Sequence, residues 1–215
     1  MTSLYKLSGI LLLGAVLVIT MALYSRLPDR LPTHWNYQGA VDQYGPRWTV
    51  WILPGVMAAI LISFWWVLPW LSPRRFEVET FLPTYGFIML VLLALTGYLQ
   101  AMILSSSLGL TQQMERAVPG GIFLFLMLLG NVLGKVRRNF WIGIRTPWTL
   151  ADERVWNATH RFAGWMFVLA GFFGLLVVLS GWPLVIAFLA LMASVAATVL
   201  YSLYYYKRLQ RRGEV

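Results

Sequence analysis

The sequence has no cysteine and few charged residues. Without cysteine, a disulfide-stapled scaffold and thiol chemistry are both excluded. Charged residues make up only 12% of the 215 residues, against about 25% in an average soluble domain. Hydrophobic residues make up 59%, which is too much apolar surface for one small core and excludes intrinsic disorder. A soluble globular enzyme is therefore excluded as well.

The sequence does contain long runs of residues without charge. A helix needs about 20 largely apolar residues to cross the hydrocarbon of a bilayer. Six runs meet this requirement: 7–24, 51–71, 83–104, 118–136, 162–180 and 183–206. Lys135, near the end of the fourth run, is the only charged residue inside them. Because backbone groups cannot stay unpaired in lipid, we expect an all-α, polytopic integral membrane bundle of six transmembrane helices. No cleavage pattern follows the first run, which we interpret as an uncleaved anchor.

The distribution of basic residues predicts the orientation of this bundle. The net charge is +9, from 17 Lys and Arg against 8 Asp and Glu. With the N-terminus in the cytoplasm, 13 of the 17 basic residues fall on inner segments, and Arg26, Arg30, Arg47 and Arg116 fall on outer ones. Cytoplasmic loops carry such an excess of Lys and Arg. We therefore expect both termini to be cytoplasmic, and we interpret the charge as a topology signal rather than a nucleic-acid footprint.

One membrane domain, residues 1–215, is expected to account for the chain. Residues 1–71 hold the first two spans and an outer loop at 25–50, and residues 83–206 hold four more spans and an inner segment at 137–161. We find no internal repeat and no low-complexity segment that would divide the chain further. The two non-membrane segments are where function is expected.

A helix is expected within the inner segment. Thr149 followed three residues later by Asp152 is typical of an N-terminal helix cap, and Pro147 disfavours helix before it. Apolar residues then recur at helical spacing from Ala151 to Phe162. We therefore expect a helix from Leu150 onward that lies at the inner interface and turns into the fifth span.

A long pattern in the inner segment resembles the signature of the SdpI family. The pattern runs Asn139-x3-Gly143-Ile144-Arg145-Thr146-Pro147-Trp148-Thr149-Leu150 and continues Asp152-Glu153-x-Val155-Trp156-x2-Thr159-His160-Arg161. The outer loop is similar to the uncharacterised domain that precedes this signature in many members. That similarity lies in Leu31-Pro32-Thr33-His34-Trp35-Asn36-Tyr37-Gln38-Gly39-Ala40-Val41-Asp42, with Arg47 where the domain often has Lys. Together the two patterns cover nearly the whole chain.

The resemblance implies a multi-pass protein of the bacterial cell membrane, surrounded by membrane lipids, that protects a cell from a secreted, membrane-active toxin peptide. In the family's namesake system the membrane protein also holds a transcriptional repressor at the membrane. A cytosolic regulator on the inner face is therefore the second partner that the resemblance implies. Neither role implies a cofactor, catalysis or direct contact with nucleic acid.

Six residues of the outer loop are candidates for binding the toxin peptide: His34, Trp35, Asn36, Gly39, Asp42 and Arg47. Aromatic and arginine side chains are good anchors at interfaces. The same residues also fit a merely folded cap, in which glycines make turns and His34 bonds to Asp42. The sequence leaves both interpretations open.

Nine residues of the inner segment form the second candidate site: Asn139, Gly143, Arg145, Thr146, Pro147, Trp148, Thr149, Trp156 and His160. Asn139 and Arg145 are suited to an anionic group, either a lipid phosphate or an acidic patch on a cytosolic partner. Alternatively, the basic residues here only enforce orientation, although the glycine, proline and tryptophan content favours a folded element. A metal site is not expected, because the two histidines, His34 and His160, should lie on opposite faces of the membrane.

Two other functional classes fit the sequence less well. A membrane metalloprotease needs His-Glu-x2-His, and an intramembrane aspartyl protease needs two aspartates inside spans; neither pattern is present. A transporter or channel for a small or lipid-like substrate is the main alternative, although a mid-membrane charge and an internal repeat are both missing. Gln100 and Asn131, the strongest hydrogen-bonding residues within the runs, are expected to join helices rather than to bind a substrate.

Overall fold

The computed structural model describes residues 2–36, 41–73, 78–110 and 114–214. Within these residues, six helices are long and apolar enough to cross a membrane: Leu4–Tyr24, Arg47–Leu71, Val78–Ser107, Met114–Leu133, Glu153–Ser180 and Leu184–Arg211. Each overlaps one of the six predicted runs, which confirms the expected number of spans. The fifth helix is longer than its run because it already begins at Glu153, inside the inner segment, and continues into the fifth span.

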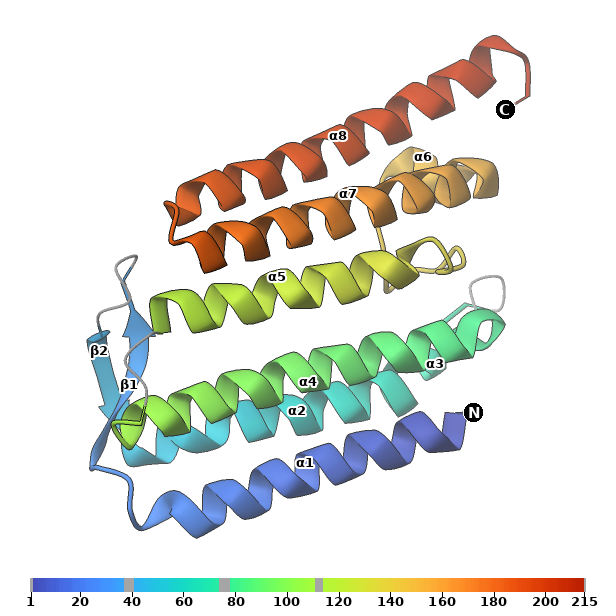
Figure 1. Ribbon diagram of the computed structural model, residues 1–215. Coiled ribbons are helices and arrows are strands. Elements are labelled where there is room, and N and C mark those ends of the chain that lie inside the picture. Colours follow the sequence, from blue (N-terminus) through green and yellow to red (C-terminus); the bar gives the residue numbers. More distant parts are fainter. Residues whose placement is uncertain (1, 37–40, 74–77, 111–113, 215) are drawn as a thin grey trace.

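The first three spans pack together as one group (Figure 1). This group contains α1 (Thr2–Tyr24), α2 (Ile52–Ile62) and α4 (Leu82–Ser107). A 3-10 turn, η1 (Arg47–Trp51), leads into α2, and a π turn, η2 (Ser63–Val67), joins α2 to the short α3 (Leu68–Leu71). A second 3-10 turn, η4 (Val78–Phe81), leads into α4. We call α1 to α4 the first half of the bundle.

The last three spans form the second half, in which α5 (Met114–Leu133) and α8 (Leu184–Arg211) both pack on α7 (Glu153–Ser180) (Figure 1). The short helix α6 (Pro147–Ala151) precedes α7. Glycines let α5 and α7 approach closely: a Cβ placed on Gly130 would lie 2.8 Å from the carbonyl oxygen of Gly164. Small residues of this kind are what membrane helices use to bring backbones into contact.

A β-hairpin corrects the all-α expectation in one place. Strand β1 (Arg30–Trp35) pairs antiparallel with β2 (Val41–Pro46), and Leu31 lies opposite Gly45. The register is interrupted on both sides of His34, as in a β-bulge. Leu27 and Leu31 are buried against Val50 and Leu104, so the root of the hairpin has a small core of its own.

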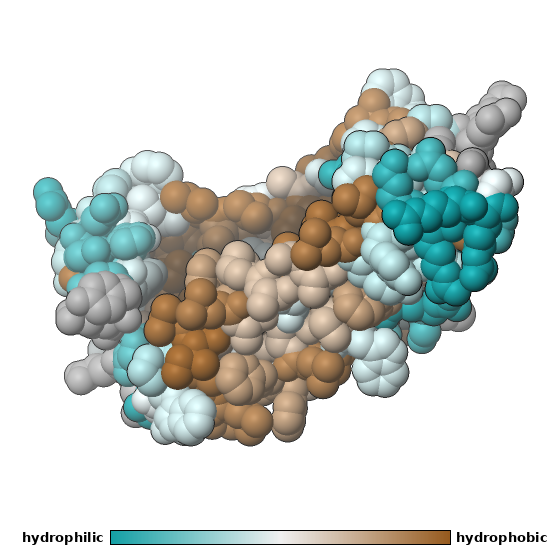
Figure 2. Space-filling view, turned by 90° about the horizontal axis from the view of Figure 1, so that it is seen from above, coloured by the Kyte–Doolittle hydropathy of each residue, from teal (hydrophilic) through white to brown (hydrophobic). Residues whose placement is uncertain are grey.

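The bundle has two hydrophilic ends separated by an apolar band. Figure 2 shows hydrophobic side chains along the middle of the molecule and hydrophilic ones gathered at either end. Large apolar residues on α1 and α8, such as Val18 and Leu200, are more than half exposed, as lipid-facing residues would be. Figure 1 places the hairpin at one end and α6 with both termini at the other. We call these the hairpin end and the motif end.

The two halves meet chiefly along α4 and α5, at what we call the seam. The hydroxyl of Tyr98 on α4 donates to the carbonyl of Ala117 on α5 at 2.8 Å. Below this bond the seam contains an apolar hollow of about 350 Å³, lined by residues that include Leu95, Gly121 and Phe125. The seam therefore contains an apolar opening between the two halves.

Candidate functional site

Asn139 organises the loop that leads from α5 to α6. Its side chain is fully buried. Its amide nitrogen donates to the carbonyls of Arg137 (2.8 Å) and Ile142 (3.0 Å), and its amide oxygen accepts from the backbone N–H groups of Trp141 and Ile142, each at 2.7 Å. An amide has two donor hydrogens and two acceptor lone pairs. All four are used within the loop, so Asn139 has no donor left for the anion that the sequence suggested.

His160 pins the same loop to α7. The N–H of Ile144 donates to Nε2 of His160 at 3.0 Å, and Nδ1 of His160 lies 2.8 Å from the carbonyl of Trp156. The neutral imidazole with its proton on Nδ1 satisfies both contacts. Gly143 has a φ of +117°, and a Cβ there would overlap Nε2 of His160. Only glycine fits between the loop and the imidazole.

Trp156 completes the buried cluster beneath this loop. Its ring stacks on the ring of His160 with the centroids 4.0 Å apart, and its indole N–H donates to the carbonyl of Val136 at 2.8 Å. Both side chains are fully buried. Trp156 and His160 thus act as parts of the core, and neither is open to a ligand.

The helix cap at α6 differs from the predicted one. Thr146, not Thr149, caps the helix: its hydroxyl accepts from the N–H of Thr149 at 3.2 Å, while the Thr149 hydroxyl accepts from the N–H of Thr146 at 2.9 Å. Pro147 starts the helix at its first position, where its missing N–H costs nothing. Asp152, expected as the third residue of a capping box, is itself the N-cap of α7. The structure thus has two helix caps, Thr146 for α6 and Asp152 for α7, in place of the single cap predicted at Thr149.

Two tryptophans tie this region to both halves of the bundle. The indole N–H of Trp141 donates to the hydroxyl of Ser72, just after α3, at 2.8 Å. The indole N–H of Trp148 donates to the hydroxyl of Ser202 on α8 at 2.5 Å. Residues 137–161, which we call the motif segment, thus hold the two halves together at the motif end.

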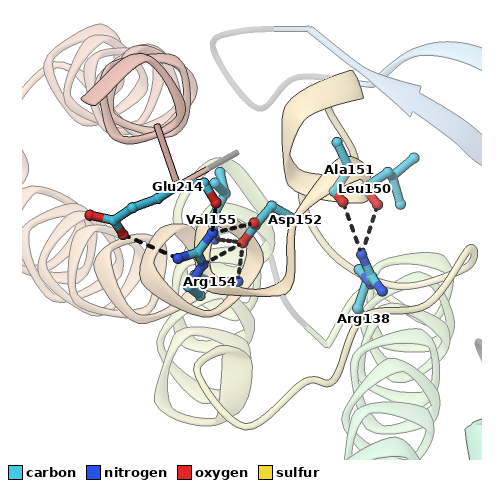
Figure 3. Close-up of polar contacts among 7 residues, drawn as sticks. All are labelled: Arg138, Leu150, Ala151, Asp152, Arg154, Val155 and Glu214. Atoms are coloured by element: carbon cyan, nitrogen blue, oxygen red, sulfur yellow. Dashed lines mark hydrogen bonds and ion pairs between the residues drawn. The ribbon is translucent and has the colours of Figure 1, made fainter. Parts of the chain in front are cut away.

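Arginines fix the two helix ends inside the motif segment (Figure 3). Arg138 donates to the carbonyls of Leu150 and Ala151 at the end of α6, at 3.1 and 3.3 Å. Arg154 forks onto both carboxylate oxygens of Asp152, at 2.9 and 3.3 Å. These bonds, helped by the backbone N–H groups of α7, hold the pKa of the Asp152 carboxyl below its usual range.

Arg154 also reaches the end of the chain. It donates to a carboxylate oxygen of Glu214 at 3.1 Å and to the Glu214 carbonyl at 2.6 Å (Figure 3). Arg154 and Glu214 are sixty positions apart in the chain, so their pairing could not be inferred from residue spacing in the sequence. Of the motif residues predicted as a site, Arg145 is the exposed cation, and it donates to the carbonyl of Phe140.

At the hairpin end, Arg47 supports the hairpin rather than facing outward. Its guanidinium bonds to the carboxylate of Asp29 at 2.6 Å and to the carbonyl of Pro28 at 3.2 Å. It also lies 5.7 Å from the ring centre of Tyr24 at the end of α1. Arg47 thus joins the start of η1 to the linker before β1, which is a structural use of a residue predicted to bind a ligand.

The rest of the predicted outer site is exposed or lines a hollow. Nδ1 of His34 lies 2.5 Å from a carboxylate oxygen of Asp42, and both side chains are well exposed at 57% and 41%. His34, Trp35 and Asn36 line one wall of a hollow of about 300 Å³. The indole N–H of Trp35 is buried and has no hydrogen-bond partner among the described residues. Tyr37 and Gly39, also named from the sequence, lie outside the described residues.

No pattern in the sequence predicted the opposite wall of this hollow. It consists of the first turns of α5, including Glu115 and Pro119, and of Leu184 at the start of α8. Glu115 is half-buried in this wall. Because the hairpin and α5 are some eighty residues apart, only the folded chain brings them together. The hollow lies between the two halves of the bundle, and we call it the hairpin hollow.

Comparison with known proteins agrees with both sequence patterns. The model of the SdpI/YfhL protein family matches residues 135–206, and that of a domain of unknown function (DUF1648) matches residues 11–58. The immunity protein SdpI of Bacillus subtilis (strain 168) is 33% identical over 195 residues, which cover 88% of this chain and 90% of the relative. No solved structure matches. With six helices suited to span a membrane and this identity over most of its length, the chain is a multi-pass bacterial membrane protein that belongs to the SdpI family.

Proposed function

We propose that this protein is an immunity protein that protects its cell from a secreted, membrane-active peptide toxin. Two lines of support carry the proposal. The first is the similarity to a relative named as an immunity protein over most of both chains. The second is the hairpin hollow, which offers aromatic and polar groups at one end of a membrane bundle. No catalytic step is part of this proposal.

The proposed orientation places the hairpin outside the cell. Basic residues concentrate at the motif end, where Arg208 and Arg211 belong to the last turn of α8. Cytoplasmic segments carry such an excess. With the motif end in the cytoplasm, both termini are cytoplasmic and the hairpin faces the medium from which a secreted peptide would arrive.

The hairpin hollow has the chemistry for a short stretch of peptide. Trp35 contributes an aromatic side chain to one wall, and aromatic side chains are good anchors at interfaces. Glu115 in the facing wall supplies an acceptor for a peptide N–H or a cationic side chain. The His34–Asp42 pair at the rim adds exposed groups beside the opening. The open hollow between the hairpin and α5, lined by aromatic and polar residues, is the observation that carries the proposed binding site.

A survival assay tests the proposal. A sensitive Gram-positive host expressing the intact protein is challenged with a panel of secreted membrane-active peptides, and survival is compared with that of the empty host. We expect protection against at least one peptide, and we expect Trp35→Ala and Asp42→Ala to lose most of it. Tyr44→Ala is the matched control, because Tyr44 is an exposed aromatic of the same hairpin that does not line the hollow.

Amounts of protein in the membrane are measured for each variant, so that loss of protection is separated from loss of protein. Undiminished survival of the empty host would make the panel uninformative, so the panel is restricted to peptides that kill it. If the intact protein protects against none of these, the immunity proposal is wrong. If Trp35→Ala and Tyr44→Ala protect equally well, immunity stands but the hollow is not the binding site.

A second proposed role is recruitment of a cytosolic regulator at the motif end. The exposed Arg145, next to a rigidly held loop, gives a basic surface for an acidic patch on such a partner. Changing Arg145 to Glu is expected to abolish co-purification of the regulator while leaving toxin survival intact. Loss of both together would argue against two separate surfaces.

Transport of a small or lipid-like substrate is the competing function. The observation in its favour is the apolar hollow in the seam between α4 and α5. Flux of labelled lipid or peptide in proteoliposomes measures it directly. Protein-dependent flux that Ala94→Phe reduces, by enlarging a side chain that lines this hollow, would favour transport over immunity by binding.

A further inference from the structure

A second hollow lies between α5 and α7, near the motif end. It has a volume of about 340 Å³ and is lined on one side by Asn131 and Lys135 and on the other by Arg161 and Trp165. None of these residues belongs to the hairpin hollow or to the seam. Two cations, one amide and one indole thus share a single opening.

Glycines create this hollow. Gly130 and Gly164 bring the two backbones into contact, since a Cβ on either would lie 2.8 Å from the carbonyl oxygen of the other. One turn along, Gly134 faces the start of the Arg161 side chain, and a Cβ placed on Gly134 would lie 3.3 Å from Cγ of Arg161. Because Gly134 has no side chain, a space remains beside it between the closely packed helices α5 and α7. The floor is backbone and the walls are the longer neighbouring side chains.

The two cations in the hollow lack a neutralising partner within the part of the chain that the structure describes. There, neither the ammonium of Lys135 nor the guanidinium of Arg161 has a hydrogen-bond or ion-pair partner. The nearby carboxylates of Asp152 and Glu214 are both bonded to Arg154. Both side chains are exposed, so an anion that enters the hollow can interact with two cations at once.

The position of the hollow decides which anion is suitable. Helix α5 ends at Leu133, so Lys135 lies where the apolar span gives way to the polar motif end. Trp165, which is 70% exposed, and Val168 lie further toward the middle of the bundle. Exposed tryptophan is typical of the level of lipid headgroups. The hollow is therefore cationic at its polar edge and apolar at its membrane edge.

We propose that this hollow binds one anionic glycerophospholipid, with the lipid phosphate between Lys135 and Arg161 and an acyl chain passing over Trp165 and Val168. The guanidinium of Arg161 forms paired hydrogen bonds to phosphate oxygens, and the ammonium of Lys135 adds a point charge. Asn131 contributes a donor to the glycerol or ester oxygens. Basic pockets between helices at the cytoplasmic side suit such headgroups. The proposal is independent of the immunity role.

Lipid retention by the purified full-length protein tests this site. The protein is extracted in mild detergent, supplied with phosphatidylglycerol or phosphatidylcholine, and examined by native mass spectrometry for lipid that stays bound. We expect one phosphatidylglycerol to be retained in preference to phosphatidylcholine. The double variant K135Q/R161Q should retain it about thirtyfold less, given the usual contribution of each basic residue at a membrane surface.

The matched control is R208Q/R211Q, which removes two exposed cations from the end of α8 and leaves the hollow unchanged. Equal loss of phosphatidylglycerol in both double variants would overturn the proposal in favour of diffuse electrostatic attraction. Thermal unfolding with each lipid gives a second readout: phosphatidylglycerol should stabilise the intact protein and R208Q/R211Q but not K135Q/R161Q. Equal stabilisation by inorganic phosphate alone would show that the site takes a free anion, and it would also overturn the lipid assignment.

Discussion

The hairpin end and the motif end use polar residues in opposite ways. In the motif segment, Asn139 and His160 bond only to the protein's own backbone, and both are buried. At the hairpin, His34 and Asp42 face solvent, and the N–H of Trp35 is buried without a partner in the described chain. The longer sequence pattern thus marks the place where the chain needs its residues to fold. The shorter pattern, at the hairpin, marks a place where His34 and Asp42 stay exposed to solvent.

The largest expected effect comes from Asn139→Ala in the motif segment. The change removes four hydrogen bonds and leaves buried backbone groups unpaired, which should lower the free energy of unfolding by about 3 kcal/mol or more. Thermal unfolding in a fixed detergent measures this. Arg145→Ala, an exposed neighbour, is the control and should stay within about 0.5 kcal/mol of the unchanged protein. Similar values for both would mean that the loop is not organised by Asn139.

Gly143→Ala is expected to be the next most damaging. Its φ of +117° is strained for any residue with a Cβ, and the added methyl would overlap the imidazole of His160. A loss of about 2–3 kcal/mol follows from a strained backbone combined with a displaced hydrogen bond. Gly109→Ala provides a comparison, because that glycine also has a positive φ, of 70°, but open space around it. The difference between the two variants isolates the contact with His160.

His160→Phe should cost about 2 kcal/mol, because it keeps the stacking on Trp156 while losing the bonds to Ile144 and to the Trp156 carbonyl. Survival against the toxin should fall only as far as the amount of folded protein falls. A complete loss of protection at a normal protein level would mean that the motif end takes part in immunity directly. The proposed division of roles between the motif end and the hairpin end would then be wrong.

A smaller, pH-dependent effect is expected at Asp152. Its pKa is lowered in the folded protein, so its contribution to stability is fully present above its unfolded pKa of about 3.9. That contribution is lost as the pH falls through the lower, folded pKa. Asp152→Asn retains a capping side chain but not the charge. The stability difference between the two proteins should therefore be constant near neutral pH and disappear in strong acid; a difference that grows with acidity would contradict the ion pair with Arg154.

His34→Ala should have the smallest effect on stability, within about 0.5 kcal/mol, because its side chain is more than half exposed. Protection should nevertheless decrease, since the change removes a group at the rim of the hairpin hollow. Stability and survival measured on the same preparations make the comparison directly. A large loss of stability would show that the His34–Asp42 pair is part of a folded cap and nothing more.

The membrane spans could be predicted from the sequence because the bilayer imposes a local rule. Every backbone group must be paired within its own segment, so length and hydropathy alone define each helix. The hairpin was missed because its strands are six residues each, and β1 contains Pro32, which weakens a strand signal. The cap was misplaced by one turn because Thr146 and Thr149 both carry hydroxyls suited to a cap, and only the fold decides which one begins the helix.

The contacts made by the candidate site residues could not be predicted from the sequence. The sequence indicated that the outer loop and the motif segment were distinctive, yet it gave no means of knowing that Asn139 bonds to backbone groups two and three positions away. Partners far apart in the chain were equally hidden, as with Glu115 facing the hairpin and Glu214 meeting Arg154. Side-chain roles that depend on backbone atoms or on distant segments leave no pattern in the residue types.

The seam between the two halves has a mechanical consequence. Lateral pressure in a bilayer acts on a protein in the plane of the membrane, and a bundle yields first where its interior has the fewest dispersion contacts. Here the hollow beside Tyr98 leaves the seam loosely filled, while Trp141 and Trp148 fasten both halves at the motif end. Because the chain itself joins α4 to α5 at the hairpin end, where Tyr98 also bonds to Ala117, the seam is held at both ends and yields most easily along the hollow between them.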